Sequence, residues 1–543
     1  MKQRFRVLVL AAITVAVTLT GACQRKQSTS ESNSSGHEPV VFNRGNGHEP
    51  ESLDPQRART DAELTILRDV YEGLTALDAD AKPAPGAARE WSVSPDGRQY
   101  TFQLRDDLRW SNGDPVVAAD FVHALRRLVD PATASPYGQI LDVIENAPDI
   151  AAGRKPPDAL GVTAPDDRTV VMRLSAPAPY VPGVLAHPST YPVHRPTLER
   201  LGREFARPGN AVSNGAFVLK EWIVGSHIVA NRNPHYWNNA ANQIDTINYL
   251  QIPDQGAELL RYRAGELDVT YTVAPAQFKW IRANLGADLR ISPQLSTYYY
   301  GYNLYRAPFK DNTKLRLALS MVIDRERLTE SVTGRGELPA YGWVPIGVAD
   351  YESQKPDWAS LPFEQRLARA RELYAAAGYS AAHPLHTQIR YNIDESHTRI
   401  AVAIASMWKE YLGVETELLG EEFKVLLQNI DRHDVTQVFR SSWIGDYNDA
   451  YTFAQYLKSD FGINLPGYRN PQYDALLARA ASEVDHAQRR AALEEAERLM
   501  LVDQPVIPIY YYVNKHLVKP YVEGWHNNVM NVQYSKNLVL RKH

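Results

Sequence analysis

The sequence predicts a mixed α/β protein built from more than one domain. Helical and strand-like hydrophobic patterns alternate along its 543 residues, and we find no internal repeat. Hydrophobic residues make up 44% of the chain, enough to bury large cores. A mature chain of about 500 residues is too long for one hydrophobic core, so we expect two or three domains.

The first clear strand follows a turn signal. Ser94-Pro95-Asp96-Gly97 combines residues that favour tight turns. Tyr100, Phe102 and Leu104 then alternate with polar residues, which places them on one face of a strand.

Two segments have the apolar spacing of helices. The first runs from Ala119 to Val129 and is stopped by Pro131. The second runs from about His397 to Leu412, with Gly413 as its C-terminal cap. Its inward face is expected to carry Ile400, Ile404, Met407, Trp408 and Tyr411.

Two further strands are predicted towards the carboxyl terminus. Val414, Thr416 and Leu418 alternate in the manner of a strand. The β-rich run from Pro505 to Tyr511 predicts a buried strand that crosses between domains.

Residues 1–22 have the pattern of a secretory signal peptide. Lys2, Arg4 and Arg6 precede an apolar run from Val7 to Leu19, and small residues follow it. The apolar run is shorter than the roughly 20 residues that span a bilayer. We therefore expect export to the cell envelope, with the mature chain in the periplasm.

Cys23 is the only cysteine of the chain, so an intramolecular disulfide is impossible. It follows Thr20-Gly21-Ala22, which resembles a bacterial lipobox, although leucine is usual where Thr20 stands. The prediction is a diacylglycerol-modified Cys23 at the start of a flexible tether over residues 23–38, which would anchor the protein to a membrane. The alternative is a chance cysteine beside a signal peptide.

The charge pattern excludes a nucleic-acid partner. Loss of Lys2, Arg4 and Arg6 with the signal peptide changes the formal net charge from −4 to −7. The remaining charges are well mixed, and no block of basic residues occurs.

The sequence offers little support for an enzyme. The serine-hydrolase elbow, the zinc-protease helix and the phosphate-binding glycine loop are all absent, and no cofactor or metal site is expected. One partial match is Ser406-Met407-Trp408-Lys409, which has the spacing found in penicillin-binding proteins. We expect Ser406 among core-facing neighbours without a base, and retain a serine hydrolase only as an unfavoured alternative.

Ten segments, in order, form a recognisable set of motifs over the whole mature chain. The most diagnostic is Trp110-Ser111-Asn112-Gly113-Asp114-Pro115-Val116, followed by Ala118 and Asp120-Phe121-Val122. The others include Ser52-Leu53-Asp54-Pro55, Tyr71-Glu72-Gly73-Leu74, Arg232-Asn233-Pro234, Gly265-Glu266-Leu267-Asp268, Trp443-Ile444-Gly445-Asp446-Tyr447-Asn448 and Tyr510-Tyr511-Tyr512-Val513-Asn514. The chain thus resembles the family 5 extracellular solute-binding proteins, especially the oligopeptide-binding members that serve ABC importers.

The resemblance implies a two-lobed, three-domain fold of the type II periplasmic-binding-protein class that closes around its ligand at a hinge. Lobe 1 would contain domain I and an inserted domain II, and lobe 2 would be domain III. The implied limits are residues 39–70, 196–295 and 514–543 for domain I, 71–195 for domain II and 296–513 for domain III.

The same resemblance implies a site that binds the two ends of a short peptide. Asp446 would meet the peptide amino terminus, because a buried ammonium needs a carboxylate partner. Arg440, His397 and Arg432 would meet the peptide carboxylate. A family lysine that binds the carboxylate of slightly longer peptides is replaced by Thr333, which leaves the preferred length open unless the nearby Arg335 substitutes for it.

Aromatic side chains are implied for the pockets and the backbone contacts of the ligand. The positions are Trp443, Tyr447, Tyr137, Tyr299, Phe423 and Tyr512. The pockets should be wide and hydrated, because water adapts to varied side chains. Two bridging cysteines of the family are absent here, where Ser296 and Ile444 stand.

The sequence therefore predicts a monomeric peptide receptor of an ABC importer. Its expected partners are peptides of about two to five residues, the permease subunits and a membrane reached through the lipid. A murein-peptide receptor of the same family and a structural or chaperone-like lipoprotein stay open as alternatives.

Overall fold

The computed structural model describes residues 38–433 and 436–541. The predicted signal peptide and the lipidation site at Cys23 lie outside these residues. From Val40 onwards the chain forms one compact unit. Within the part described, no helix has the length and apolar character needed to cross a bilayer.

Lobe 1 contains two four-stranded sheets. The first has the strand order β1-β10-β9-β8, with β1 parallel to β10 and the other pairs antiparallel. The second is antiparallel, in the order β4-β5-β7-β6. The strands are β1 (Val41–Gly45), β8 (Phe217–Ile223), β9 (His227–Arg232), β10 (Thr246–Leu250), β4 (Ala88–Val93), β5 (Gln99–Leu104), β6 (Val162–Asp166) and β7 (Thr169–Arg173).

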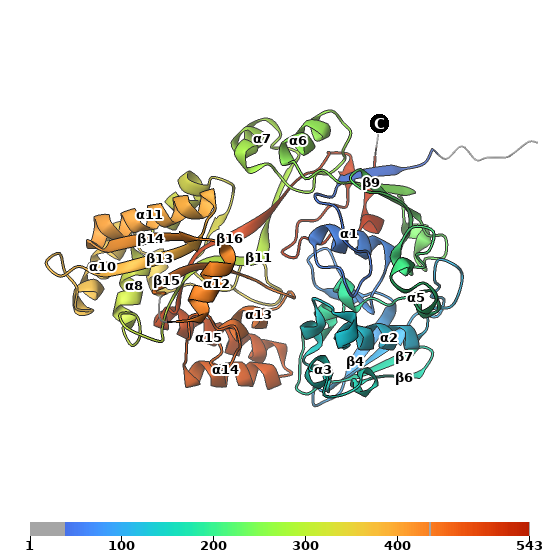
Figure 1. Ribbon diagram of the computed structural model, residues 1–543, viewed down its shortest axis with the longest axis horizontal. Coiled ribbons are helices and arrows are strands. Elements are labelled where there is room, and N and C mark those ends of the chain that lie inside the picture. The colour runs from blue at the N-terminus through green and yellow to red at the C-terminus, as the bar shows by residue number, and fades with distance from the viewer. Residues whose placement is uncertain (1–37, 434–435, 542–543) are drawn as a thin grey trace, which may run out of the picture. The chain divides into compact units, whose positions relative to one another are not determined.

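Helices and a small hairpin complete lobe 1 (Figure 1). One continuous hydrophobic core underlies both sheets and includes residues of α1 and α2. The elements are α1 (Asp61–Val70), α2 (Ala118–Val129), α3 (Ala147–Ala151), α4 (Val181–Val184), α5 (Arg195–Leu201), α6 (Gln255–Arg263), α7 (Phe278–Asn284), and the hairpin β2 (Thr75–Leu77) and β3 (Pro83–Pro85).

Lobe 2 is organised by one six-stranded mixed sheet. Its strand order is β12-β16-β11-β15-β13-β14, and β13 is parallel to both β14 and β15. The central strands β11 and β16 have long runs that are buried on both faces, as expected for a sheet between two helical layers. The strands are β11 (Leu289–Tyr302), β12 (Leu338–Pro339), β13 (His386–Asn392), β14 (Glu415–Glu421), β15 (Val438–Ile444) and β16 (Val506–Leu517).

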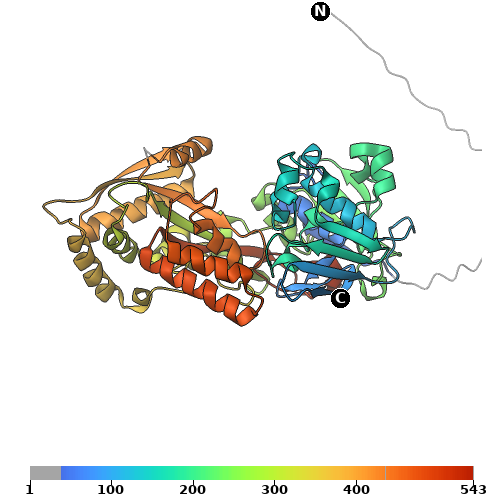
Figure 2. The ribbon, with the colours of Figure 1, turned by 90° about the horizontal axis from the view of Figure 1, so that it is seen from below.

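Separate hydrophobic cores lie on the two faces of this sheet. One core includes residues of α8, α10 and α11, and the other includes residues of α12 to α15. Helices α14 and α15 pack side by side, which both views show (Figures 1 and 2). The helices are α8 (Thr313–Met321), α9 (Arg325–Arg327), α10 (Phe363–Ala376), α11 (Glu395–Leu412), α12 (Phe423–Asp431), α13 (Tyr451–Ala454), α14 (Pro471–Ser482) and α15 (His486–Asp503).

Two long strands, β11 and β16, connect the lobes. They pair in two stretches, Leu289–Pro293 with Val513–Leu517 and Thr297–Gly301 with Val506–Tyr511. The ladder is irregular between Pro293 and Thr297. Within the gap, Leu295 bonds instead to the tail and to the loop after β15: its N–H donates to the carbonyl of Val529, and its carbonyl accepts from the N–H of Gly445.

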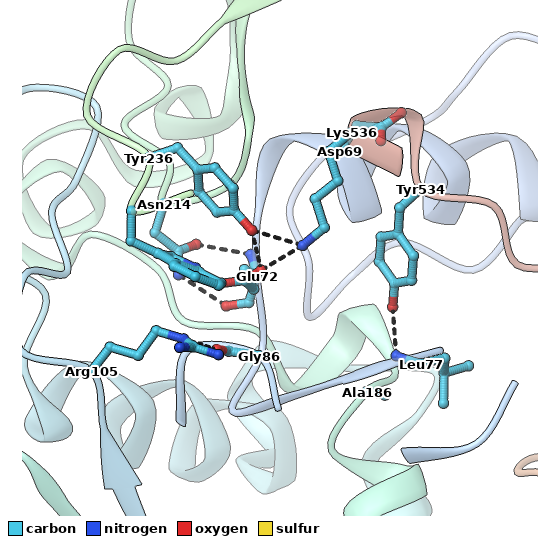
Figure 3. Close-up of polar contacts among 12 residues, drawn as sticks. Asp69, Glu72, Leu77, Gly86, Arg105, Ala186, Asn214, Tyr236, Tyr534 and Lys536 are labelled. Atoms are coloured by element: carbon cyan, nitrogen blue, oxygen red, sulfur yellow. Dashed lines mark hydrogen bonds and ion pairs between the residues drawn. The ribbon is translucent and has the colours of Figure 1, made fainter. Parts of the chain in front are cut away.

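The carboxy-terminal tail is fastened to lobe 1 by a buried polar network (Figure 3). Nζ of Lys536 lies 2.6 Å from Oε1 of Glu72, which also accepts a 2.6 Å hydrogen bond from the hydroxyl of Tyr236. Asp69 accepts hydrogen bonds from the backbone and hydroxyl of Ser535. The short antiparallel pair β17 (Val522–Glu523) and β18 (Val539–Leu540) closes the tail on itself. The segment between them is therefore held in a fixed position.

The predicted elements agree with the structure in most respects. The first predicted helix is α2, and the second is α11, which ends at Gly413 with φ = 75°. Tyr100, Phe102 and Leu104 are buried on one face of β5. The run predicted from Pro505 to Tyr511 coincides with the start of β16, one of the crossing strands, which begins at Val506. Tyr411 is only half-buried, because it lies at the edge of the inward face of α11.

Candidate functional site

A cavity of about 440 Å³ lies where α1, the crossing strands and the end of β15 meet. Each of these elements, together with the tail, supplies part of its wall. Residues from every part include Asp61 and Arg68 of α1, Gln294 and Asn514 of the crossing strands, Asp446 after β15, and Trp525 and Gln533 of the tail. The cavity is of the size that small-molecule sites have in proteins.

Asp446 presents an unpaired carboxylate to this cavity. Its side chain is solvent-accessible, and its carboxylate has no hydrogen bond or ion pair with any described residue. The backbone N–H of Asp446 donates to Oγ1 of Thr452 at 3.3 Å, which fixes the loop. The walls around the carboxylate raise its pKa through desolvation. An arriving cation would relieve that cost.

Tyr137, one of the predicted pocket residues, also lines this cavity. Its ring contacts the imidazole of His187, with 4.5 Å between the ring centroids. Burial, and secondarily the fields of Asp61 and Asp446, raise the pKa of Tyr137. The phenol therefore stays protonated, and its hydroxyl donates to the backbone carbonyl of Arg59 at 3.4 Å.

Arg440, His397 and Tyr512 come together in a second cluster, around Tyr298. The guanidinium of Arg440 lies 4.6 Å from the centroid of the Tyr298 ring and donates to the hydroxyl of Tyr512 at 3.1 Å. The hydroxyl of Tyr298 is 3.3 Å from Nδ1 of His397. A further hydrogen bond of 3.2 Å joins Arg440 to Oδ1 of Asn392 at the end of β13. This cluster does not line the cavity that contains Asp446.

Arg440 is a buried cation without an acidic partner. Its side chain is buried to 8% exposure, its Nε has no hydrogen bond, and no carboxylate of the described residues lies within 4.0 Å of it. Aromatic rings and neutral acceptors compensate part of the charge. A carboxylate ligand would supply what is missing.

His397 is neutral at physiological pH in this arrangement. Burial, and secondarily the positive charges of Arg440 and Arg335, lower its pKa to about 4, although Asp394 opposes them. The positive charge of Arg335 thus also acts on His397. A neutral imidazole next to Arg440 can donate to or accept from a ligand without adding a second fixed charge.

Thr333 ends a short π-helix, Leu328–Thr333, and Arg335 lies in the loop after it, which is braced from the crossing strand β16. Oε2 of Glu337 accepts hydrogen bonds from the hydroxyl of Thr333 and the backbone of Arg335. Nζ of Lys515 donates to the carbonyl of Arg335 at 2.9 Å. The hydroxyl of Thr333 thus bonds to Glu337 and to the carbonyl of Thr329, whereas the guanidinium of Arg335 has no hydrogen bond or ion pair with described residues.

The remaining predicted residues lie outside these two clusters. Trp443 is half-buried against Tyr456 and donates to the carbonyl of Thr452. Tyr299 is fully buried in the lobe 2 core against Trp343, so it does not line the cavity. Phe423, at the first turn of α12, is 52% exposed.

Tyr447 and Arg432 also lie outside the two clusters. The ring of Tyr447 is covered by Tyr180 of lobe 1. Arg432 is exposed at the C-terminal cap of α12. In this arrangement neither residue is among those that line the cavity.

Ser296 and Ile444 are direct cross-strand partners in the β11–β15 ladder. A pair of cysteines at these two positions would thus face each other on adjacent strands. Ser296 is buried and Ile444 is 60% exposed on the wall of the cavity. Here the ladder itself holds the two strands together.

The sequence did not single out several residues that the fold brings to the site. Tyr298 and Asn392 position Arg440, and Arg44, Arg68 and Lys515 line the cavity. The only local signal was the aromatic run that contains Tyr298, which does not indicate which ring faces the site. The others come from distant segments and have no common motif.

The partial serine-hydrolase motif has no catalytic geometry. Ser406 is exposed on α11, and its neighbours Met407 and Trp408 face the core, as expected. Lys409 pairs with Glu415 at 3.4 Å. Among the described residues there is also no cluster of three or more side chains suited to hold a metal.

Comparison with known proteins identifies the family. The model of bacterial extracellular solute-binding proteins, family 5, matches residues 82–464. The periplasmic oligopeptide-binding protein OppA of Escherichia coli K12 is 39% identical over 505 residues, which cover 92% of both chains. The periplasmic murein peptide-binding protein MppA of the same organism is 38% identical over 498 residues, covering 91% of this chain and 92% of MppA.

Solved structures agree with this assignment. The unliganded open form of MppA superposes with a TM-score of 0.88 at 38% identity, covering 93% of this chain and 98% of the other. Haemophilus influenzae OppA in complex with the peptide RPPGFSPFR gives a TM-score of 0.72 at 38% identity, with 93% and 100% covered. The two-lobed, mixed α/β fold is thus confirmed, and the chain belongs to the family 5 bacterial extracellular solute-binding proteins.

Proposed function

We propose that this protein is the extracytoplasmic receptor of an ABC importer and binds short peptides through their charged ends and backbone. The observation that carries the proposal is that the protein has both an unpaired carboxylate, Asp446, and a buried cation without an acidic partner, Arg440. A zwitterionic, extended ligand supplies the missing partner of each.

The spacing of these two residues suits a short ligand. They are six residues apart on and just after β15, so their Cα atoms are at most about 20 Å apart at about 3.3 Å per residue. The long side chain of Arg440 covers part of that span. An extended peptide of about three to five residues fills the rest.

Each end of the peptide would meet several groups. The ammonium lies at Asp446, with the hydroxyl of Tyr137 in the same cavity. The carboxylate lies at Arg440 and His397, with Tyr512 beside them. Arg335 extends the positive region and is the candidate contact for a longer peptide, while Arg432, Trp443, Tyr447, Tyr299 and Phe423 remain predicted contacts for a rearranged, ligand-bound state.

The relatives support a peptide ligand. OppA is named as an oligopeptide-binding protein, MppA as a murein peptide-binding protein, and the Haemophilus OppA structure contains a nine-residue peptide. A ligand longer than about five residues is therefore compatible with the family. Family membership also argues against an enzymatic role.

Native mass spectrometry of protein purified without denaturation tests the proposal. The expected result is a protein ion that carries retained ligands, which collisional activation releases at masses that match short peptides of the standard amino acids. Titration calorimetry of ligand-stripped protein with Ala-Ala-Ala should then give a Kd at or below the micromolar range. No retained peptide together with no calorimetric binding would overturn the proposal.

The same experiment decides the alternative ligand. MppA is about as similar to this chain as OppA is, so a murein-peptide receptor stays the second candidate. Retained ligands with γ-linked glutamate and a diamino acid would favour it. Competition between Ala-Ala-Ala and a murein tripeptide would rank the two classes.

The proposal includes a lipid anchor at Cys23 and a periplasmic location. The support is the lipobox-like sequence before Cys23 and the periplasmic names of the relatives. Metabolic labelling with an alkynyl fatty acid should label the protein and not its Cys23→Ser variant. Labelling of neither protein would contradict lipidation and leave peptide binding untouched.

A further inference from the structure

The wall of the cavity contributed by lobe 1 carries two guanidinium groups without acidic partners. Arg44 leaves β1 and Arg68 leaves the last turn of α1, and both line the cavity that contains Asp446. Neither side chain has a hydrogen bond or an ion pair with any residue that the structure describes. We propose that Arg44 and Arg68 form a subsite for an acidic side chain near the amino terminus of the bound peptide.

Arg44 is the more deeply buried of the two. Its side chain is 7% exposed, and its Nε and Nη1 have neither a hydrogen-bond partner nor access to solvent. The ring centroids of Phe42 and Tyr249 lie 5.9 Å from its guanidinium carbon, at the outer limit of a cation–π contact, so they offset only part of the charge. A buried cation without a partner is stabilised by an anion placed on the cavity side.

A purely structural role for Arg44 would require an acid inside the core. Asp69 is the nearest candidate, since the charge of Arg44 acts on its pKa. Its two oxygens, however, already accept hydrogen bonds from Tyr249 and from the backbone and hydroxyl of Ser535, all at 2.6–2.8 Å. The carboxylate is thus engaged, and it makes no ion pair with Arg44.

Arg68 contributes a second uncompensated charge. Asp61 is on the same helix, but seven residues at about 1.5 Å per residue place it roughly 10 Å away along the axis. Asp61 is also stabilised by its place in the first turn of α1. It therefore does not neutralise Arg68.

Two histidines of the same wall respond to these charges. Burial, followed by the field of Arg68, lowers the pKa of His187 to about 3. Burial also lowers the pKa of His516, with a smaller contribution in the same direction from Arg44. Both imidazoles are neutral at pH 7, so the positive potential here comes from the arginines.

The other charges of the cavity leave this potential in place. Lys515 is paired with Glu337, with 3.6 Å between Nζ and Oε1. Asp446 is assigned to the ammonium of the peptide, and this inference rests on that proposed function. With the amine at Asp446 and the carboxylate at Arg440 outside this cavity, the space beside Arg44 and Arg68 receives the side chains of the first residues.

Calorimetry with matched tripeptides tests the inference. Glu-Ala-Ala, Ala-Glu-Ala and Ala-Ala-Glu are each compared with the peptide that carries glutamine at the same position. Because a hydrogen bond to a charged group contributes roughly 1.5–3 kcal/mol, glutamate at position 1 or 2 should bind at least about tenfold tighter than glutamine. Added NaCl should reduce the difference.

The deciding variant is Arg68→Gln, since Arg68 is half-buried and its replacement should leave the fold intact. The ratio of its affinities for the glutamate and glutamine peptides should fall to about 1, while its affinity for Ala-Ala-Ala stays within about threefold of the wild type. Arg68→Lys should restore part of the ratio. Arg207→Gln, at a surface arginine that does not line this cavity, is the matched control and should keep the full ratio.

The experiment separates failure of the acidic subsite from failure of the proposed receptor function. Wild-type protein that binds every tripeptide with equal affinity for glutamate and glutamine would overturn the subsite and leave the peptide receptor standing. Protein that binds no tripeptide at all would overturn the receptor. An Arg68→Gln variant that keeps the full glutamate preference would also overturn the subsite.

Discussion

The ring of Tyr447 stacks on the ring of Tyr180, with 4.4 Å between centroids and 12° between planes. Tyr447 directly follows Asp446, and Tyr180 comes just before α4 in lobe 1. Asn448 adds a 2.9 Å hydrogen bond to the carbonyl of Ala81. The loop that presents the proposed ammonium ligand is thus also a point of contact with lobe 1.

We expect Tyr180→Ala to weaken peptide binding by about three- to tenfold. Stacked aromatic pairs contribute roughly 0.5–1.5 kcal/mol, and without the ring the loop that presents Asp446 is less ordered. Calorimetry with Ala-Ala-Ala measures the loss. Tyr180→Phe retains the ring and should bind like the wild type; an equal loss in both variants would argue against the stack.

Asp446→Ala should weaken binding by roughly 100- to 1000-fold. Removal of one partner of a buried charge pair costs roughly 3–5 kcal/mol, because the ammonium of the peptide is left without a counter-ion. The carboxylate has no partner in the unliganded protein, so thermal stability should hardly change.

A peptide with an acetylated amino terminus provides the control for Asp446. It lacks the ammonium, so wild type and Asp446→Ala should bind it with similar affinity. An unchanged dissociation constant for the free tripeptide in the Asp446 variant would refute the assigned role.

Arg440→Met and a carboxy-amidated tripeptide should not act additively. Each removes one partner of the same interaction, so each alone should cost more than tenfold, and both together little more than either. A double-mutant cycle by calorimetry gives the coupling energy. Additive effects would mean that the carboxylate binds elsewhere, with Arg335→Gln as the next variant to test.

The pH dependence of stability should show the titration of Glu258. This residue is buried and accepts a 2.6 Å hydrogen bond from the backbone N–H of Tyr271, a residue of the cavity wall. Burial raises the pKa of Glu258 from 4.5 to about 7. The folded state therefore favours the protonated form, so its contribution to the free energy of unfolding is greatest below pH 4.5 and is lost as the pH rises to about 7.

Glu258→Gln should remove that part of the pH dependence. The difference in unfolding free energy between wild type and variant should change by up to about 3 kcal/mol between pH 4.5 and 7.5, which urea denaturation measures. Glu497, with a pKa of about 7 for the same reason, should keep its own contribution in the variant. Parallel pH profiles of unfolding free energy in wild type and variant would contradict the raised pKa of Glu258.

Much of the local structure could be predicted, because it depends on short-range periodicity. Helices α2 and α11 follow from the spacing of their apolar residues, and Gly413 ends α11 because its positive φ suits glycine. Export, lipidation and the residues for the two ends of the peptide are also proposed from contiguous motifs, and they stay predictions. Asp446 and Arg440 could be proposed because they lie in one short segment of β15 and its loop.

Only the tertiary structure decided which side chains face the ligand. Tyr298 and Tyr299 are neighbours on β11, yet the first supports Arg440 and the second is closed in the lobe 2 core. Both rings are fully buried, so polar–apolar alternation gives no indication of the face. Arg44, Arg68, Asp446 and Lys515 meet at one cavity although the two arginines and the other two residues come from opposite ends of the chain. Pairing across such distances is set by how β11 and β16 cross between the lobes, which no local pattern encodes.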